Sequence, residues 1–379
     1  MKKKYFLVAL LGAFNIALAQ IPAGYYNSAI GSGYTLKTQL KDIIDDNNDG
    51  LSPEYQSIQL SYGDLYDTYE LSDVDIYYDH SGPIPASNKP LLDMYSEKPS
   101  EADSYEYIYG SAQQDDGMLG NAEGQRFNRE HTIPNSVFGG SFPERSDAHF
   151  VIPADKYINA QRNITPYGET NAATQNFTNG TKIGPSRNAD YTSGYTNTVF
   201  EPIDEFKGDI ARIYFYFVTR YEDDLTSYGS YDMFDGTANQ AIAQPFLETL
   251  YNWHIQDPVS QREIDRNNAI FTQHNNRNPF IDNPSYVYEI WQNVLSTNNF
   301  NLDNNSVSIY PNPVTNNVIN ISSNKNLDVI IYNVLGQNIL STKTTPNANT
   351  INLENLNSGV YIVKLKSDTG TTTKQLIKK

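Results

Sequence analysis

The stretch "FNREHTIPNSVFGG", residues 127–140, sets a carboxylate beside an imidazole in a chain that has only 5 histidines. Glu130 and His131 are neighbours, and neighbouring residues of a regular strand point to opposite faces. Both side chains can serve one site only if the strand ends or turns here. Pro134 favours such an interruption, because proline donates no hydrogen bond to a strand ladder. The stretch therefore predicts a strand that ends at a polar site.

A second polar stretch follows, "SDAHFVIPADKYINAQRN", residues 146–163. Pro153 suits the beginning of a helix, which we predict over residues 154–162. Asn159 and Arg162 are three residues apart, so they share one face of that helix. The two stretches together predict a strand and a helix that present polar side chains to each other.

These residue types suit the hydrolysis of a phosphodiester. Glu130 and Asn159 offer hard oxygen ligands for a divalent cation, of which Mg²⁺ is our first expectation and Mn²⁺ or Ca²⁺ the alternatives. The ion would polarise the phosphate. His131 can take a proton from the attacking water, and Arg162 can hold two phosphate oxygens. We therefore predict Glu130 and Asn159 as metal ligands, with His131 and Arg162 as catalytic residues.

Each of these residues also has a structural interpretation. A lone Glu130–His131 pair is common at the edge of a core. Asn159 can cap a helix, because its side chain bonds readily to backbone groups. Arg162 can form a salt bridge within an acidic protein.

The other histidines fit no familiar metal motif. His80, His254 and His274 are widely separated, and the H-E-x-x-H pattern of zinc proteases is absent. No G-x-x-x-x-G-K-[ST] phosphate loop is present either. We interpret His149 as a hydrogen-bonded structural histidine, together with Asp147.

The stretch "DDNNDGL" resembles part of a calcium loop. Asp45, Asn47, Asp49 and Gly50 occupy its positions 1, 3, 5 and 6, but Gln56 stands where a bidentate glutamate is expected. An ordinary acidic turn over Asp45–Gly50 is the favoured interpretation, and a structural Ca²⁺ site is the alternative.

The N-terminus predicts export. Three lysines precede an apolar run that ends in small residues, the pattern of a signal peptide over residues 1–19. No later segment is long and apolar enough for a membrane span. The chain contains no cysteine, so burial or bound metal, and no disulfide, must stabilise the exported protein.

The charge is distributed unevenly. The formal net charge of the chain is −17, while the 7 lysines and 3 acidic residues of residues 307–379 give that segment a net charge of +4. The remaining body is therefore strongly acidic. It can bind nucleic acid only through a local basic patch.

The hydrophobic pattern predicts two domains, a mixed α+β body over residues 20–295 and a small domain over residues 307–379. Between them, residues 296–306 form an Asn-rich linker. In the body, "DVDIYYD" and "SYEYIYG" resemble strands and residues 177–197 resemble a long surface loop. Helices are predicted at "TLKTQLKDIID", "QAIAQPFLETLYNWHIQDP" and "SYVYEIWQNVL", and a long buried helix at Ile203, Phe206, Ile210, Ile213, Tyr214 and Phe217.

The C-terminal segment has the alternating pattern of an antiparallel β-sandwich of the Ig-like kind. In "VYIVKL", Tyr361, Val363 and Leu365 face one way. "IYPNP", "IYNVLGQ", "LNSGVYIVKLKS" and "KQLIKK" resemble the sorting domain of the type IX secretion system. That resemblance implies that the secretion machinery is a partner and that the protein is secreted to the cell surface or beyond. An Ig-like binding module is the alternative.

Five motifs of the body, in order, are similar to the endonuclease I family: "LLDMYSEKP", "NREHTIPNSVF", "SDAHFVIPADKYINAQRN", "FEPIDEFKGDIARIYFYFVTRYED" and "NNRNPFIDNP". The resemblance implies a ββα-metal (His-Me finger) core. It also implies a secreted, sequence-nonspecific nuclease that cleaves DNA, and often RNA, to 5′-phosphate products with one divalent metal ion.

Residue by residue, the resemblance implies that Glu130 is a metal ligand and His131 the general base. Asn159 opens the family's helix motif and would be the second protein ligand. Arg162 closes that motif and Asn163 follows it, so both are expected to contact phosphate or to support the site.

The resemblance also implies that Arg277 reaches the site and that Asp282 orients a neighbour. The chain departs from its relatives in lacking cysteines near Glu130 and in having Ile133 and Val137 where aromatic residues are usual. These departures affect the expected loop geometry and substrate preference, and leave the ligands unchanged.

Two other functions remain open from the sequence. The first is a catalytically silent surface-binding or adhesion protein on a nuclease scaffold. The second is a metal-dependent phosphodiesterase that acts on small or lipid phosphates.

Overall fold

The computed structural model describes residues 21–45, 57–78, 89–115, 117, 120–187, 195–297, 307–323, 325–333, 338–367 and 370–379. The predicted signal peptide, nearly all of the predicted calcium loop and most of the predicted linker lie outside these residues. The described buried hydrophobic side chains form two separate clusters, one between Tyr25 and Trp291 and one between Val307 and Leu376.

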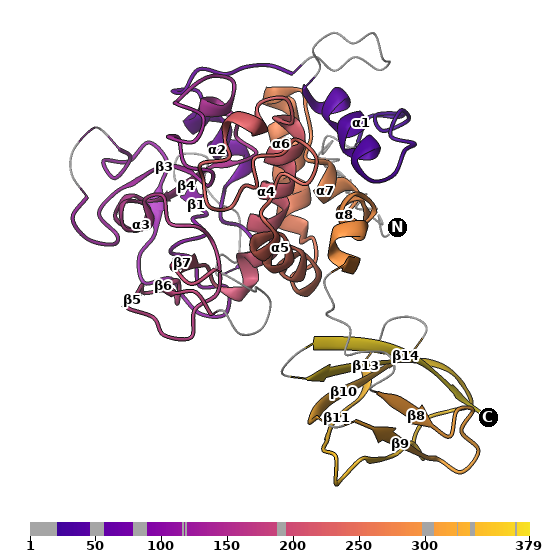
Figure 1. Ribbon diagram of the computed structural model, residues 1–379. Helices are drawn as coiled ribbons and strands as arrows, with labels where there is room; N and C mark the ends of the chain where they lie inside the picture. The colour runs from indigo at the N-terminus through magenta and orange to yellow at the C-terminus, as the bar shows by residue number, and fades with distance from the viewer. Residues whose placement is uncertain are drawn as a thin grey trace, which may run out of the picture.

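Helices dominate the body (Figure 1). They are α1 (Tyr34–Asp45), α2 (Leu65–Ser72), α3 (Lys156–Arg162), α4 (Lys207–Arg220), α5 (Gln244–Gln256), α6 (Gln261–His274), α7 (Pro279–Asp282) and α8 (Ser285–Thr297). Short 3-10 turns cover Glu144–Ser146, Asp204–Phe206 and Leu225–Ser227. Among the described helices, none combines the length and the apolar character needed to cross a bilayer.

Helix α4 is the centre of the body and packs against α1, α5 and α7. All 14 of its residues are buried, which confirms the predicted long buried helix. A buried arginine within it, Arg212, is neutralised by Glu263 of α6 through bonds of 2.5 and 2.8 Å. The helix begins later than the periodicity indicated, because Asp204–Phe206 form a 3-10 turn ahead of it.

The strands of the body are short and lie in three antiparallel sheets. They are β1 (Pro90–Leu91) with β2 (Tyr107–Ile108), β3 (Phe127–His131) with β4 (Val151–Asp155), and β5 (Gln175–Asn176), β6 (Lys182–Pro185) and β7 (Thr198–Glu201). The strand predicted at "DVDIYYD" is wrong for its described residues, because only Val74 pairs, in an isolated bridge to Leu91. The loop predicted at 177–197 is interrupted by β6.

Strands β3 and β4 and helix α3 form a ββα unit. Glu130 pairs with Ile152 and His131 with Val151 across the antiparallel ladder. The prediction that the helix begins at Ala154 is wrong, because Pro153 and Ala154 belong to β4. The helix begins after Asp155, whose carboxylate accepts hydrogen bonds from the backbone N–H groups of Tyr157 at 2.7 Å and Ile158 at 2.9 Å. This cap fixes the helix directly behind the strand pair.

Many of the tyrosines belong to the core of the body. Several of their hydroxyl groups donate to acceptors there, as is usual for buried phenols. Tyr69 donates to the carbonyl of Val151 at 2.9 Å and Tyr214 to that of Thr132 at 2.9 Å. These bonds tie α2 and α4 to the ββα unit.

The C-terminal segment contains two antiparallel sheets, and with the body's helices it confirms the predicted α+β fold. One sheet has the order β11-β10-β13-β14 and the other β12-β9-β8. The strands are β8 (Ser308–Tyr310), β9 (Val318–Ser322), β10 (Leu327–Asn333), β11 (Asn338–Thr344), β12 (Thr350–Asn352), β13 (Gly359–Ser367) and β14 (Gly370–Lys378). Tyr361, Val363 and Leu365 of β13 are buried and their neighbours exposed, which confirms the predicted alternation.

Buried histidines make the body sensitive to acid. Burial lowers the pKa of His149 to about 3 and that of His274 to about 4. An unfolded histidine has a pKa of about 6.5, so between that pH and about 4 the unfolded chain binds protons that the folded chain does not. The contribution of these two histidines to the free energy of unfolding is therefore fully present above about pH 6.5 and is lost as the pH drops toward 4.

We expect the midpoint of thermal unfolding to be lower at pH 5 than at pH 7 by roughly 5 °C or more. Calorimetry at the two pH values measures this difference. The substitution His149→Gln removes one titrating group and is expected to make the difference smaller. Equal midpoints at both pH values for the unmodified chain contradict the prediction.

Candidate functional site

Strand β3 distributes polar side chains over two faces. Asn128 and Glu130 face α3, where Asn128 Oδ1 accepts a 2.9 Å hydrogen bond from Asn159 Nδ2 and Glu130 binds Arg162. His131 ends the strand on the other face, where its ring stacks on that of Tyr62 at a centroid distance of 5.8 Å. Strand β3 thus ends at His131, as predicted, while the side chains of Glu130 and His131 still point to opposite faces.

Glu130 is a buried carboxylate with 2% of its surface exposed. Its Oε1 accepts hydrogen bonds from the Tyr95 hydroxyl at 2.9 Å and from Arg162. Burial raises the pKa of Glu130 above its usual value, although the charge of Arg162 opposes this shift. Within the part of the chain that the structure describes, Oε2 accepts no hydrogen bond. One oxygen is thus held by the protein, and the other is available for a ligand.

Arg162 is wholly buried and bonds to the strand end. Besides Glu130, its guanidinium donates to the carbonyls of His131 at 3.0 Å and Thr132 at 2.6 Å. The same group lies 4.2 Å above the ring of Tyr167. This geometry favours the structural interpretation of Arg162, because its exposed fraction is 0% and a phosphate cannot reach it without rearrangement.

Asn159 is half-buried on the first turns of α3. Its amide nitrogen donates to Asn128, so its amide oxygen points away from Asn128. Within the described residues, that oxygen accepts no hydrogen bond. Asn128 was missed in the sequence. The signal for it was its spacing of two residues from Glu130, which puts both side chains on one strand face.

A carboxylate oxygen and an amide oxygen are the donors that a hard divalent cation prefers. The donor set of Glu130 and Asn159 fits such an ion. Two protein ligands would leave most coordination positions to water and substrate.

The ring of His131 is held in one orientation. Its Nε2 lies 3.2 Å from the carbonyl oxygen of Arg145. A carbonyl only accepts, so Nε2 carries the hydrogen and Nδ1 keeps its lone pair in the neutral ring. Burial lowers the pKa of His131 to about 4, and the ring is therefore neutral at pH 7.

The surroundings of His131 are locally positive in an acidic chain. The charges of Arg145, Arg129 and Arg162 all act to lower its pKa. The guanidinium of Arg129 lies 3.6 Å from the ring centre of Tyr62, and that of Arg145 lies 4.9 Å from it. Arg129 and Arg145 thus form a local cluster of positive charge, of the kind that nucleic-acid binding to an acidic protein requires. Tyr62 and Arg145 were not singled out in the sequence, since only the fold brings them to His131.

The structure does not bring Arg277 to Glu130, His131 and Asn159. Arg277 is 1% exposed and binds Asp282 through bonds of 2.6 and 2.8 Å and Asn268 through one of 2.8 Å. Asp282 does orient a neighbour, and that neighbour is Arg277 itself. Arg277 thereby links α7, through Asp282, to α6, through Asn268.

His149 and Asp147 lie in the core, as the structural interpretation predicts. His149 Nε2 lies 3.2 Å from the carbonyl of Asn276, and its ring packs 4.6 Å from that of Tyr216. Asp147 accepts hydrogen bonds from the hydroxyls of Tyr216 and Tyr221, each at 2.8 Å.

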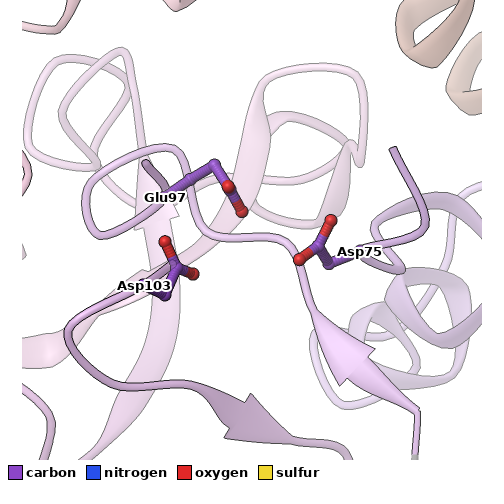
Figure 2. A group of neighbouring side chains, drawn as sticks. All are labelled: Asp75, Glu97 and Asp103. Atoms are coloured by element: carbon purple, nitrogen blue, oxygen red, sulfur yellow. The ribbon is translucent and has the colours of Figure 1, made fainter. Parts of the chain in front are cut away.

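A second acidic group lies apart from the ββα unit. Figure 2 shows the carboxylates of Asp75, Glu97 and Asp103 pointing toward one another, with one oxygen of each within 4.8 Å of the others. Among the described residues this is the one group of three or more such side chains close enough to share an ion. Neither Glu130 nor His131 belongs to it, and three carboxylates alone do not identify a cation site.

Comparison with known proteins identifies the family of the body. Residues 32–285 match the family model described as Endonuclease I, whose members generally use a divalent metal ion. The chain is 31% identical over 272 residues to an extracellular ribonuclease of Bacillus amyloliquefaciens, covering 70% of this chain and 78% of the relative. It is also 36% identical over 169 residues to an extracellular ribonuclease of Bacillus subtilis (strain 168), covering 44% of this chain and 54% of that relative.

The C-terminal strands have a match of their own. Residues 308–379 match the secretion system C-terminal sorting domain, which confirms the predicted export by type IX secretion. The body and this domain together describe a nuclease that is sent out of the cell. The chain belongs to the Endonuclease I family and ends in a secretion sorting domain.

Proposed function

We propose that this protein is a metal-dependent, sequence-nonspecific endonuclease that hydrolyses phosphodiester bonds of DNA and RNA to 5′-phosphate products. The observation that supports this most is His131, a neutral imidazole held at a strand end, one residue along the chain from the buried carboxylate of Glu130. The names of the two ribonuclease relatives support RNA as one substrate. Contacts to phosphate alone explain the absence of sequence preference.

In this proposal Glu130 and Asn159 hold the divalent cation, with Mg²⁺ preferred and Mn²⁺ or Ca²⁺ as alternatives. When bound, the ion polarises the scissile phosphate and stabilises the charge that develops on it. Arg162 keeps the Glu130 carboxylate ionised and oriented toward the ion. Tyr95 does the same through its 2.9 Å hydrogen bond.

His131 acts as the general base. Its Nδ1 takes a proton from the attacking water while the carbonyl of Arg145 holds the opposite nitrogen. The phosphodiester anion beside the ring raises the low pKa of His131 toward neutrality, since a nearby negative charge favours the imidazolium. Arg145, which is exposed, contacts the phosphate in the role that was predicted for Arg162.

Removal of the metal tests the proposal. Chelation by EDTA is expected to lower the cleavage of plasmid DNA and of RNA by about a thousandfold or more, because the ion supplies several kcal/mol of charge stabilisation. Gel electrophoresis after graded incubation measures the rate, and readdition of Mg²⁺ or Mn²⁺ restores it. Circular dichroism in EDTA serves as the control for folding. Cleavage by the chelated protein at its untreated rate contradicts the proposal.

The product ends are tested separately. Fragments that carry a 5′-phosphate accept radioactive phosphate from polynucleotide kinase only after phosphatase treatment. Labelling without that treatment contradicts the proposed position of the cut.

A further inference from the structure

The segment from Ser141 to Asp147 alternates between anchored and outward side chains. Glu144 Oε1 accepts a 2.5 Å hydrogen bond from the Tyr228 hydroxyl, and Ser146 Oγ donates to the carbonyl of Leu60 at 2.6 Å. Both residues are buried. The anchors fix the segment on the body, so its outward side chains have a defined position.

The outward side chains are Phe142 and Arg145. Phe142 is a large apolar residue with 43% of its surface exposed. The Arg145 guanidinium lies 6.0 Å from the ring centre of Phe142 and 4.9 Å from that of Tyr62. We call Phe142, Arg145 and Tyr62 the aromatic platform.

The aromatic platform is preformed and lies next to the proposed general base, His131. Tyr62 is fixed by Arg129, which donates to the Tyr62 carbonyl at 2.6 Å and covers the ring at 3.6 Å. The ring of Tyr62 stacks on His131 with only 19° between the two planes. A nucleotide whose phosphate lies at His131 would therefore place its base beside the platform.

We propose that the aromatic platform binds an unstacked nucleobase next to the phosphodiester that is cut. An aromatic ring beside a guanidinium suits the flat face of any base, and the positive charge suits the neighbouring phosphate. Bases in a duplex are already stacked and cannot turn their faces to Phe142. The ligand class is thus single-stranded or locally unpaired nucleic acid, and this inference rests on the proposed nuclease function.

The test compares one sequence as a single strand and as a duplex. The substitution Phe142→Leu keeps an apolar side chain but removes the stacking face. We expect it to lower kcat/KM for the single strand by about tenfold, mainly through a higher KM, since one base–aromatic stack contributes that much or more. Cleavage of the duplex is expected to stay within about twofold of that by the unmodified protein. Phe142→Trp keeps a stacking face, so its kcat/KM for the single strand is expected to equal that of the unmodified protein.

Tyr288→Leu is the matched control, because Tyr288 is 49% exposed on α8, outside the proposed site. It is expected to leave both substrates unaffected. The inference is overturned if Phe142→Leu lowers cleavage of single strand and duplex equally, if it lowers neither, or if Tyr288→Leu has the same effect.

A failure of the nuclease function gives a different result. In that case the unmodified protein cuts neither substrate in Mg²⁺, and the platform is tested by binding alone. The fluorescence of 2-aminopurine in a single strand is then expected to be quenched by the unmodified protein and not by Phe142→Leu. Equal quenching by both proteins overturns the inference.

Discussion

Substitution of His131 by alanine is expected to lower kcat for phosphodiester cleavage by roughly 10²–10⁴-fold, the usual contribution of a general base. The imidazole is neutral at pH 7, and its Nδ1 is left with a lone pair because Nε2 faces the Arg145 carbonyl. Among the residues that the structure describes, the other histidines, His149, His254 and His274, are buried in the core and cannot replace it. Initial rates with a fluorescent oligonucleotide at saturating substrate measure the change.

Two further variants separate proton transfer from positioning. His131→Gln can still donate to the Arg145 carbonyl, but its amide does not accept a proton at neutral pH. We expect it to be as inactive as His131→Ala. In His131→Gly, added imidazole is expected to restore part of the rate, because a free base can occupy the space of the missing ring. A fully active His131→Gln variant contradicts the role of general base.

The elements at the site could be predicted from local patterns because their signals are local. The apolar period identified α4, and Pro134 correctly indicated that β3 ends early. The start of α3 could not be predicted as well. Pro153 suits a helix start and an edge strand equally, and the cap by Asp155 decided between them.

The contacts of the arginines could not be predicted, because they depend on pairs distant in the chain. Arg162 has the same sequence signal whether it binds phosphate or Glu130, and only its 0% exposure distinguishes these roles. Arg145 and Tyr62 belong to no motif, and they meet because the Ser146 hydroxyl bonds to the carbonyl of Leu60. The need for a local basic patch followed from the net charge, whereas its position required the fold.

Arg162 is expected to contribute to folding stability, whereas His131 is expected to contribute to proton transfer. Arg162→Met leaves the buried Glu130 without its cation, and loss of one partner of a buried ion pair costs about 3–5 kcal/mol. We expect the free energy of unfolding in urea to fall by that amount. Cleavage is expected to fall as well. Without Arg162, burial raises the pKa of Glu130 further, and a protonated carboxyl group is a poorer metal ligand.

The double variant Glu130→Gln/Arg162→Met distinguishes this role from phosphate binding. Removal of the carboxylate also removes the unpaired charge, so the double variant is expected to unfold with a smaller loss of free energy than the sum of the two single losses. Its cleavage is expected to remain absent, because Glu130→Gln removes the only negatively charged group of the two proposed metal ligands. If Arg162 instead contacted the phosphate, Arg162→Met would raise KM and leave the unfolding curve unchanged. Its burial against Tyr167 and its bonds to two backbone carbonyls of the strand end favour the stability role, and that combination of results would contradict it.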